Sequence, residues 1–223
     1  VSGEDEKLSL IKEVSKNNGT EYIRPSDNSV TKEELRKFSY IEHPSNISVA
    51  LEVCEQVGIK RNIAIEGMQK VKPDLGALVS WMLFKNDRKI QFINGMAAND
   101  PVSTLQIWKF ILDRYPAKGG TCVFFNSRED RPVRTRQMIE LALQEIKPDY
   151  FFVRADKVDQ IINNASYSSP ETTINTFSLA QDFENIVGSI LSLPSDSLVY
   201  AIGNQVGDGQ KILNLISESR KSV

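Results

Sequence analysis

The chain has 223 residues, which is long enough to bury a sizeable core in one large domain or two small ones. Its formal net charge is -2 with 25% charged residues, so the composition does not indicate nucleic acid or an anionic membrane as a general partner. No run of about 20 apolar residues occurs, and we expect no membrane-spanning helix. The chain begins with Val1 and lacks a signal-like segment, so we expect a piece of a longer protein whose other parts could carry an anchor.

The residue inventory limits the chemistry available to this chain. Cys54 and Cys122 lie far apart in apolar stretches, which favours buried free thiols in a reducing compartment over a disulfide. His43 is the single histidine, so a histidine-rich metal centre is excluded and a hydrolytic triad has no support. Neither GxxxxGK(S/T) nor GxGxxG occurs. The chain alone therefore has no evident means of holding and activating a nucleoside triphosphate.

The first part of the chain predicts helices separated by turns, with one short strand. A capping box at residues 31–34 opens the second helix, and Pro44 suits the first position of the third. His43 and Asn46 could cap that third helix. The expected helices end at Asn18, Phe38, Val57 and Val71, the fourth is capped by Asn62, and the strand covers residues 21–23.

A change of composition around residues 73–76 is the best candidate for a domain boundary. Turn residues mark it, and two strands follow at residues 77–84 and 89–93, joined by the polar turn 85–88. We therefore divide the chain into residues 1–75 and 76–223.

The segment from Ile90 to Arg114 predicts a strand, a short loop and a well-defined helix. Asp100 is a good N-cap, and Pro101 suits the first helical position because its missing N–H would have no intrahelical partner. The loop from Asn94 to Asp100 would place unpaired N–H groups at the positive end of the helix dipole, which suits an anion. An ordinary connection between a strand and a helix explains the same local pattern.

The second half of the chain alternates short apolar strands with amphipathic helices, which predicts an α/β fold with a parallel, doubly wound sheet. Ligands in such sheets bind beyond the carboxyl ends of the strands. The expected strands cover residues 121–125, 150–153, 172–176 and 197–202, and the expected helices cover residues 101–114, 134–146, 157–164, 178–193 and 209–219.

Polar residues follow these strands in a pattern typical of an anion-binding rim. Residues 128–136 contain four arginines, and the glycine-containing loop 203–209 follows the last strand. Guanidinium groups bind carboxylates and phosphates bidentately, and small residues let backbone N–H groups approach an anion. The alternative is a solvated surface network in which Arg131 and Arg134 pair with Glu129 and Asp130. The sequence leaves both interpretations open.

Five segments in this order resemble motifs of the Mur-ligase superfamily, most closely the poly-γ-glutamate synthase (CapB/PgsB) family of capsule biosynthesis. The resemblance covers essentially the whole chain. The five segments are HPSN at 43–46, KPDLGAL at 72–78, INGMAANDPVSTLQIWK at 93–109, NSREDRPVRT at 126–135 and VYAIGNQVGDGQKI at 199–212.

This resemblance implies a Rossmann-like, mostly parallel C-terminal domain at residues 76–223, preceded by the tail of a central ATPase domain. It further implies an ATP-dependent amide ligase that uses Mg²⁺ and joins glutamate through γ-amide bonds. The implied partners are glutamate or poly-γ-glutamate and small integral-membrane subunits, with no nucleic acid. The implied location is the cytoplasmic side of the membrane, in a synthase complex.

The resemblance also assigns candidate site residues by position. The catalytic residues, the phosphate loop and the metal ligands of the family would lie before Val1, so this chain carries no expected metal ligand. The implied nucleotide-binding residues are His43, Asn46, Asn94, Asn99 and Asp100. The implied substrate-binding residues are Arg128, Asp130, Arg131, Arg134, Gly203 and Asn204.

Two expectations follow from these assignments and from one departure. Many relatives carry an arginine suited to the γ-phosphate where this chain has Val79. Because phosphate cradling and metal neutralisation are essential to phosphoryl transfer, we expect the 223-residue chain alone to be inactive as a ligase. The competing expectation is a non-catalytic module that binds an acidic polymer or a partner subunit through its arginine-rich rim.

Overall fold

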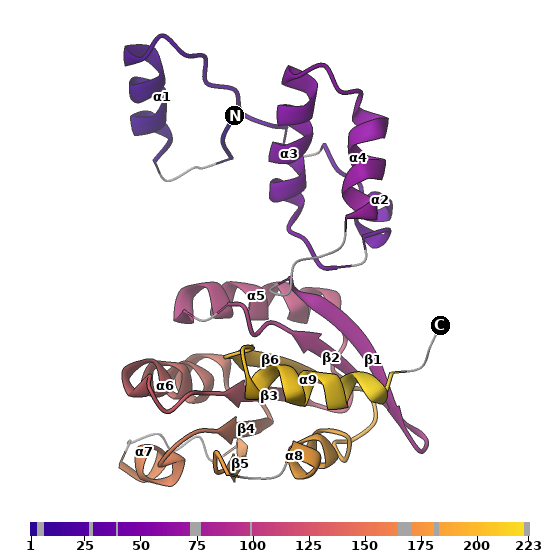
Figure 1. Cartoon of the computed structure of the whole chain (residues 1–223), viewed down its shortest axis with the longest axis vertical. Helices are drawn as coiled ribbons and strands as arrows, with labels where there is room; N and C mark the ends of the chain where they lie inside the picture. The colour runs from indigo at the N-terminus through magenta and orange to yellow at the C-terminus, as the bar shows by residue number, and fades with distance from the viewer. Residues whose placement is uncertain are drawn as a thin grey trace. The chain divides into compact units, whose positions relative to one another are not determined.

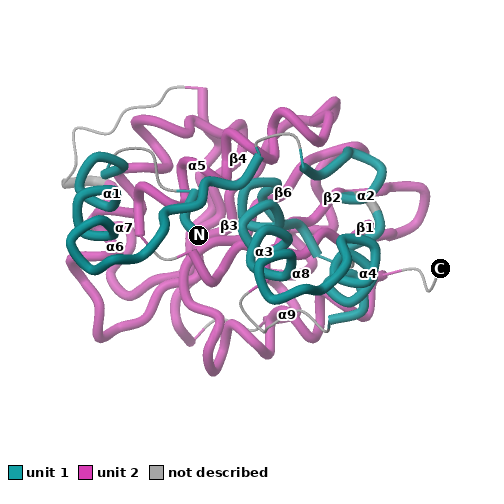
Figure 2. The backbone as a smooth tube through the Cα atoms, turned by 90° about the horizontal axis from the view of Figure 1, so that it is seen from above, with its two compact units in different colours: residues 1–74 teal, residues 75–223 magenta. Residues whose placement is uncertain are grey.

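The computed structural model describes the chain except residues 4–6, 27–28, 39, 72–76, 99, 165–170, 181–182 and 221–223. The chain divides into two compact units, residues 1–74 and residues 75–223, which Figure 2 shows in two colours. The boundary lies within one residue of the predicted one, although residues 72–76 themselves are outside the described part. We describe each unit by itself.

Unit 1 contains four helices among its described residues, and two of them, α2 and α3, begin at a side-chain cap. At α2 the Thr31 side chain accepts a hydrogen bond from the Glu34 N–H, while the Glu34 carboxylate accepts one from the Thr31 N–H at 2.8 Å. This is the predicted capping box. The helices are α1 (Leu8–Asn17), α2 (Lys32–Arg36), α3 (Pro44–Gln56) and α4 (Arg61–Lys70).

Two local predictions for unit 1 are wrong. Residues 21–23 form no strand, because the Ser2 N–H donates to the Ile23 carbonyl at 3.2 Å but no ladder of such bonds extends from it among the described residues. Helix α4 starts one residue before Asn62, and the flanking Lys60 makes no side-chain cap. The core of this unit is small, with partly buried side chains around five buried ones: Phe38, Ile47, Leu51, Ala64 and Ile65.

Unit 2 is built on a six-stranded sheet within the described residues, with the strand order β1-β2-β6-β3-β4-β5 (Figure 1). All neighbours are parallel except β1 and β2, which form an antiparallel hairpin at one edge. The strands are β1 (Val79–Lys85), β2 (Arg88–Asn94), β3 (Thr121–Asn126), β4 (Tyr150–Arg154), β5 (Thr173–Phe177) and β6 (Ser197–Gly203). The predicted α/β fold with a mostly parallel sheet is therefore confirmed.

Helices cover both faces of this sheet, as parallel strands require. The remaining elements are α5 (Pro101–Arg114), α6 (Pro132–Glu140), the π-helical turn η1 (Leu141–Ile146), α7 (Val158–Asn164), α8 (Phe183–Ile190) and α9 (Asp208–Glu218). One core joins α8 and α9 to the face of β6 that carries Val199 and Ala201. On the opposite face the Tyr200 ring stacks on Trp108 of α5, with 6.0 Å between the ring centroids.

Two predicted helices of unit 2 differ clearly from the observed ones. Helix α6 begins at Pro132, two residues before the predicted start, because proline again takes the first helical position. Its predicted final turn widens into the π-helical η1 and ends at Lys147 in a left-handed conformation, φ 48°. Helix α8 starts at Phe183 and not at Ser178, and it ends at Ile190. Helix α5, by contrast, has the predicted bounds.

Candidate functional site

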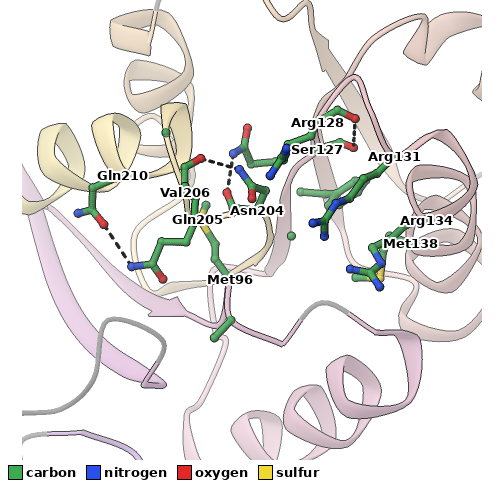
Figure 3. A pocket seen from close by; sticks show the side chains of 15 residues that line it. Met96, Ser127, Arg128, Arg131, Arg134, Met138, Asn204, Gln205, Val206 and Gln210 are labelled. Atoms are coloured by element: carbon green, nitrogen blue, oxygen red, sulfur yellow. Dashed lines mark hydrogen bonds between the residues drawn. The ribbon is translucent and has the colours of Figure 1, made fainter.

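A cavity of about 440 Å³ lies beyond the carboxyl ends of β2, β3 and β6, where a doubly wound sheet binds its ligands. We call it the arginine-rimmed pocket (Figure 3). Its lining residues are Met96, Ala97, Phe125, Asn126, Ser127, Arg128, Arg131, Arg134, Met138, Gly203, Asn204, Gln205, Val206, Gly207 and Gln210.

The pocket combines apolar walls with positive charge. Met96, Phe125 and Met138 are buried beneath it. Arg131, at the N-cap of α6, and Arg134, within α6, lie on one side, opposite Asn204 and its neighbours on the other (Figure 3). Among the described residues that line the pocket, the charged ones are all arginines. The arrangement suits a ligand that has both methylene groups and carboxylates.

The arginines of the pocket differ in the ion pairs that they form. Asp130 accepts two hydrogen bonds from the Arg128 guanidinium, from Nε and from a terminal nitrogen, each at 2.8 Å. Glu129 and Arg131 make no ion pair with any described residue. The predicted pairing of Arg131 with Glu129 or Asp130 is therefore absent among the described residues, and Asp130 pairs with Arg128 instead. Asp130 itself lies outside the pocket lining.

The wall opposite the arginines depends on Gly203 and Asn204. Gly203 has φ +98°, and a Cβ atom there would lie 2.3 Å from the Asn126 carbonyl oxygen, so only glycine fits. The Asn204 N–H donates to the Asn126 carbonyl, and the Asn126 side-chain amide donates back to the Asn204 carbonyl, both at 2.7 Å. Both predicted residues line the pocket, and their backbone fixes its shape.

Arg154 is a residue of this region that the sequence analysis missed. It ends β4, its side chain is 2% exposed, and its guanidinium donates to Asn126 Oδ1 at 3.1 Å and to Asp208 Oδ2 at 2.9 Å. It also donates to the Leu179 carbonyl at 2.6 Å and lies over the Phe183 ring. An arginine closing the apolar run YFFVR was the available signal, because a charge there needs buried partners.

These contacts connect the end of β4 to the end of β3, to the start of α9 and to the segment that follows β5. Burial opposes ionisation of Asp208, but hydrogen bonds from Arg154 and Lys211 hold its pKa below the usual value. The Nε atom of Arg154 is buried and has no partner among the described residues. The Nε–H group therefore contributes no hydrogen bond, and the hydrogen bonds of Arg154 come from its two terminal nitrogens.

Two described residues predicted for the nucleotide loop, Asn94 and Asp100, form side-chain hydrogen bonds with nearby backbone N–H groups. The Asn94 side chain is buried and accepts a hydrogen bond from the Met96 N–H at 3.2 Å. Asp100 caps α5 by accepting from the Ser103 N–H at 2.9 Å, and this bond lowers the pKa of its carboxyl group. A role for Asn94 or Asp100 beside a nucleotide stays a prediction. Asn99 lies outside the described residues.

The nucleotide residues predicted in unit 1 are also engaged locally. The His43 ring accepts a hydrogen bond from the Ser45 N–H at 3.3 Å, which confirms it as the N-cap of α3. Asn46 does not cap the helix, because its side chain donates to Glu42 Oε1 at 2.7 Å. A role for either residue at adenine or ribose stays a prediction.

The sequence analysis also made predictions about metal ligands, the two cysteines and membrane-spanning helices. Within the described ranges, no three histidine, cysteine or acidic side chains gather into a group that could hold a metal ion. Cys54 and Cys122 are free, Cys122 is buried and Cys54 is partly exposed. Burial raises the pKa of the Cys122 thiol far above its usual value, so it is an inert part of the core. None of the described helices has the length and apolar character needed to cross a membrane.

Comparison with protein families assigns this chain to a known group. Residues 80–219 match the family described as the poly-gamma-glutamate synthase CapB C-terminal domain. The chain belongs to this family. It is 31% identical to the capsule biosynthesis protein CapB of Bacillus anthracis, over 99% of this chain and 47% of that protein. It is 27% identical to the PGA synthase CapB of Bacillus subtilis strain 168, over 98% of this chain and 56% of that protein.

The chain therefore spans about half the length of these curated CapB relatives. Solved structures share its fold at low sequence identity. The MurF ligase of Thermotoga maritima in complex with ADP matches 81% of this chain with a TM-score of 0.53 and 13% identity, covering 39% of its own length. A MurF structure from Acinetobacter baumannii matches 79% with a TM-score of 0.56 and 15% identity, covering 38% of its own length. The fold of this CapB-family chain is that of part of a Mur ligase.

Proposed function

We propose that this chain is part of an ATP-dependent amide ligase that makes poly-γ-glutamate, and that it supplies the binding site for glutamate or the growing polymer. Membership of the CapB family and the likeness to Mur ligases support a ligase role. The observation that carries the substrate assignment is the pair Arg131 and Arg134 above a floor of buried apolar side chains.

The chemistry of glutamate suits this pocket. A glutamyl residue has two methylene groups and one or two carboxylates, so it can place its apolar part against Met96 and Met138. Its carboxylates can then accept hydrogen bonds from Arg131 and Arg134. Each guanidinium group is a planar fork of N–H donors that matches the two oxygens of a carboxylate. The arginines would bind and orient the substrate and offset its negative charge.

The complete reaction would need groups that this chain does not supply. ATP would provide the phosphoryl group that activates a carboxylate as an acyl-phosphate, and an amine would then displace phosphate to form the γ-amide bond. We assign the phosphate loop and the Mg²⁺ ligands to the other part of the parent protein, because the described residues of this chain offer no matching group. We place that parent protein in the cytoplasm at the membrane, with integral-membrane subunits of a synthase as partners.

A titration tests the substrate assignment directly. We expect R131A and R134A each to weaken binding of a γ-linked glutamate trimer to this chain by about tenfold, since a hydrogen bond to a charged group contributes roughly 1.5–3 kcal/mol. R114A is the matched control, because Arg114 lies at the exposed end of α5 outside the pocket lining. Isothermal titration calorimetry provides the measurement. Equal affinities for all three variants would contradict the assignment.

A second function has one specific observation in its favour. Four arginines lie at or beside the start of α6, and a module that only holds an acidic polymer would need no phosphate loop. Such a module should bind the polymer tightly by itself and lose that binding steeply with salt. A ligase fragment should bind weakly until the preceding part of the protein is restored.

ATP turnover separates these two functions. We expect the purified 223-residue chain to produce no ADP from ATP and glutamate, and we expect the complete parent protein to do so. A coupled assay for ADP measures both. Turnover by the chain alone would overturn the predicted inactivity, whereas a parent protein that stays inactive while the chain binds polymer would favour the binding module.

A further inference from the structure

A second cavity of about 630 Å³ lies between α6 and α7, which are neighbours in both views (Figures 1 and 2). We call it the α6–α7 cleft. Its charged lining residues differ from those of the arginine-rimmed pocket, because acidic and basic groups occur in equal number. They are Arg128, Arg136, Lys157, Glu129, Glu140 and Asp156.

The two cavities lie on opposite sides of α6. Arg134 and Met138, four residues apart, line the arginine-rimmed pocket, while Arg136 and Glu140 at the same spacing line the cleft. Arg128 lines both cavities, and Asp130 holds its guanidinium in place. An extended ligand can therefore pass from one cavity to the other across Arg128 at the positive end of α6.

Four charged side chains of the cleft, two acidic and two basic, do not neutralise one another. Within the part of the chain that the structure describes, Glu129, Arg136, Asp156 and Lys157 form no ion pair and no side-chain hydrogen bond. All four are exposed, so their groups stay solvated and accessible. Opposite charges that line one space without pairing are complementary to a ligand that carries both signs.

Poly-γ-glutamate contains one residue of that kind. Each internal residue has its amino group in an amide and keeps only its α-carboxylate, which Glu129 and Asp156 would repel. The terminal residue with an unmodified α-amino group carries an ammonium beside a carboxylate. Glu129 and Asp156 can accept hydrogen bonds from that ammonium, while Arg136 and Lys157 can donate to that carboxylate.

We propose that the α6–α7 cleft binds the free-amino end of poly-γ-glutamate, with the carboxylates of the following residues in the arginine-rimmed pocket. This inference rests on the proposed function, because it takes the polymer as the substrate class. Recognition of both charges would select the end of the polymer over its interior.

A pair of synthetic ligands tests the proposal. We compare a γ-linked glutamate trimer that has a free amino group with the same trimer acetylated at that nitrogen, using calorimetric titration of the 223-residue chain. Acetylation removes the ammonium and leaves every carboxylate in place. We expect it to weaken binding about tenfold, the effect of losing one charged hydrogen-bonding group.

Variants of the cleft sharpen the test. The double variant E129Q/D156N should weaken binding of the free-amino trimer about tenfold and leave the acetylated trimer unchanged, whereas R136A should weaken both. R114A again serves as the control. Because these side chains are exposed, the thermal unfolding midpoint should not move. Equal affinity for the two trimers, or an equal effect of E129Q/D156N on both, would overturn the proposal.

The outcome also separates this inference from the proposed function. R134A alters the arginine-rimmed pocket and leaves the α6–α7 cleft intact. If R134A has no effect while acetylation weakens binding, the substrate assignment of the arginine-rimmed pocket fails, and with it the placement of the following carboxylates there, whereas binding of the free-amino end in the cleft stands. If R134A weakens both trimers while acetylation has no effect, the cleft proposal alone fails.

Discussion

Arg154 is the single residue on which the back of the arginine-rimmed pocket depends most. Its guanidinium connects Asn126 of β3, Asp208 of α9 and the Leu179 carbonyl. Replacing it with methionine keeps the apolar stem but leaves the buried Asn126 oxygen without its donor, so we expect a loss of about 1–3 kcal/mol of unfolding free energy. Urea denaturation measures this loss.

R154K provides the comparison for that variant. Lysine keeps the positive charge but lacks the planar fork, so it can serve fewer of the three acceptors, and we expect an intermediate stability. If R154M and the unchanged chain unfold within about 0.5 kcal/mol of each other, Arg154 does not hold the strand ends together.

Gly203 and Gly188 offer a second test at single residues, with opposite signs. G203A places a Cβ atom 2.3 Å from a backbone oxygen at φ +98°, so we expect it to cost about 1–3 kcal/mol. G188A adds a methyl group on α8 where nothing lies within 4 Å, so alanine should stabilise the chain by about 0.5–1 kcal/mol. Thermal unfolding of the two variants compares them, and a neutral G203A would show that the β6 loop can rearrange.

At the scale of elements, the capping box of α2 predicts a pH dependence in unit 1. A hydrogen bond from Arg61, followed by one from the Thr31 N–H, lowers the pKa of Glu34 to about 2 from an ordinary 4.5. Because the folded-state pKa is the lower one, the stabilisation is present above about pH 4.5 and is lost as the pH falls through about 2. NMR titration of the Glu34 side chain measures that pKa.

E34Q should remove this dependence. We expect it to destabilise unit 1 by about 1 kcal/mol at pH 7, because it weakens both the cap and the Arg61 ion pair, and to have little effect near pH 2. E33Q changes the neighbouring exposed carboxylate and is the control. A difference between E34Q and the unchanged chain that persists at pH 2 would contradict this explanation.

At the scale of the whole molecule, the two units differ in how much core they can bury. Among the described residues, unit 2 surrounds a six-stranded sheet with helices on both faces, whereas the core of unit 1 has five buried apolar side chains. We expect residues 75–223 alone to unfold cooperatively in urea, and residues 1–74 alone to show no cooperative transition. Circular dichroism follows both, and non-cooperative unfolding of residues 75–223 would show that unit 2 depends on unit 1.

The sequence by itself determined the elements whose ends are set by local chemistry. Asp100 and Pro101 specify the start of α5 through contacts between residues close together in the chain. Asp100 caps the helix as predicted, by accepting a hydrogen bond from the Ser103 N–H. The alternation of apolar strands and amphipathic helices likewise specified a mostly parallel sheet, because parallel neighbours need crossover helices. The clustering of arginines before α6 and of glycines after β6 indicated the region of the pocket.

Only the tertiary structure decided which of those polar residues meet. Asn94, Asp100 and His43 turned out to hold backbone groups, and Asp130, which lies outside the pocket lining, pairs with Arg128. Arg154 reaches partners 28 and 54 residues away, and no local pattern encodes such distances. The reason is physical: helix caps are formed by neighbours in the chain, whereas a buried charge or a pocket wall depends on the order in which strands pair.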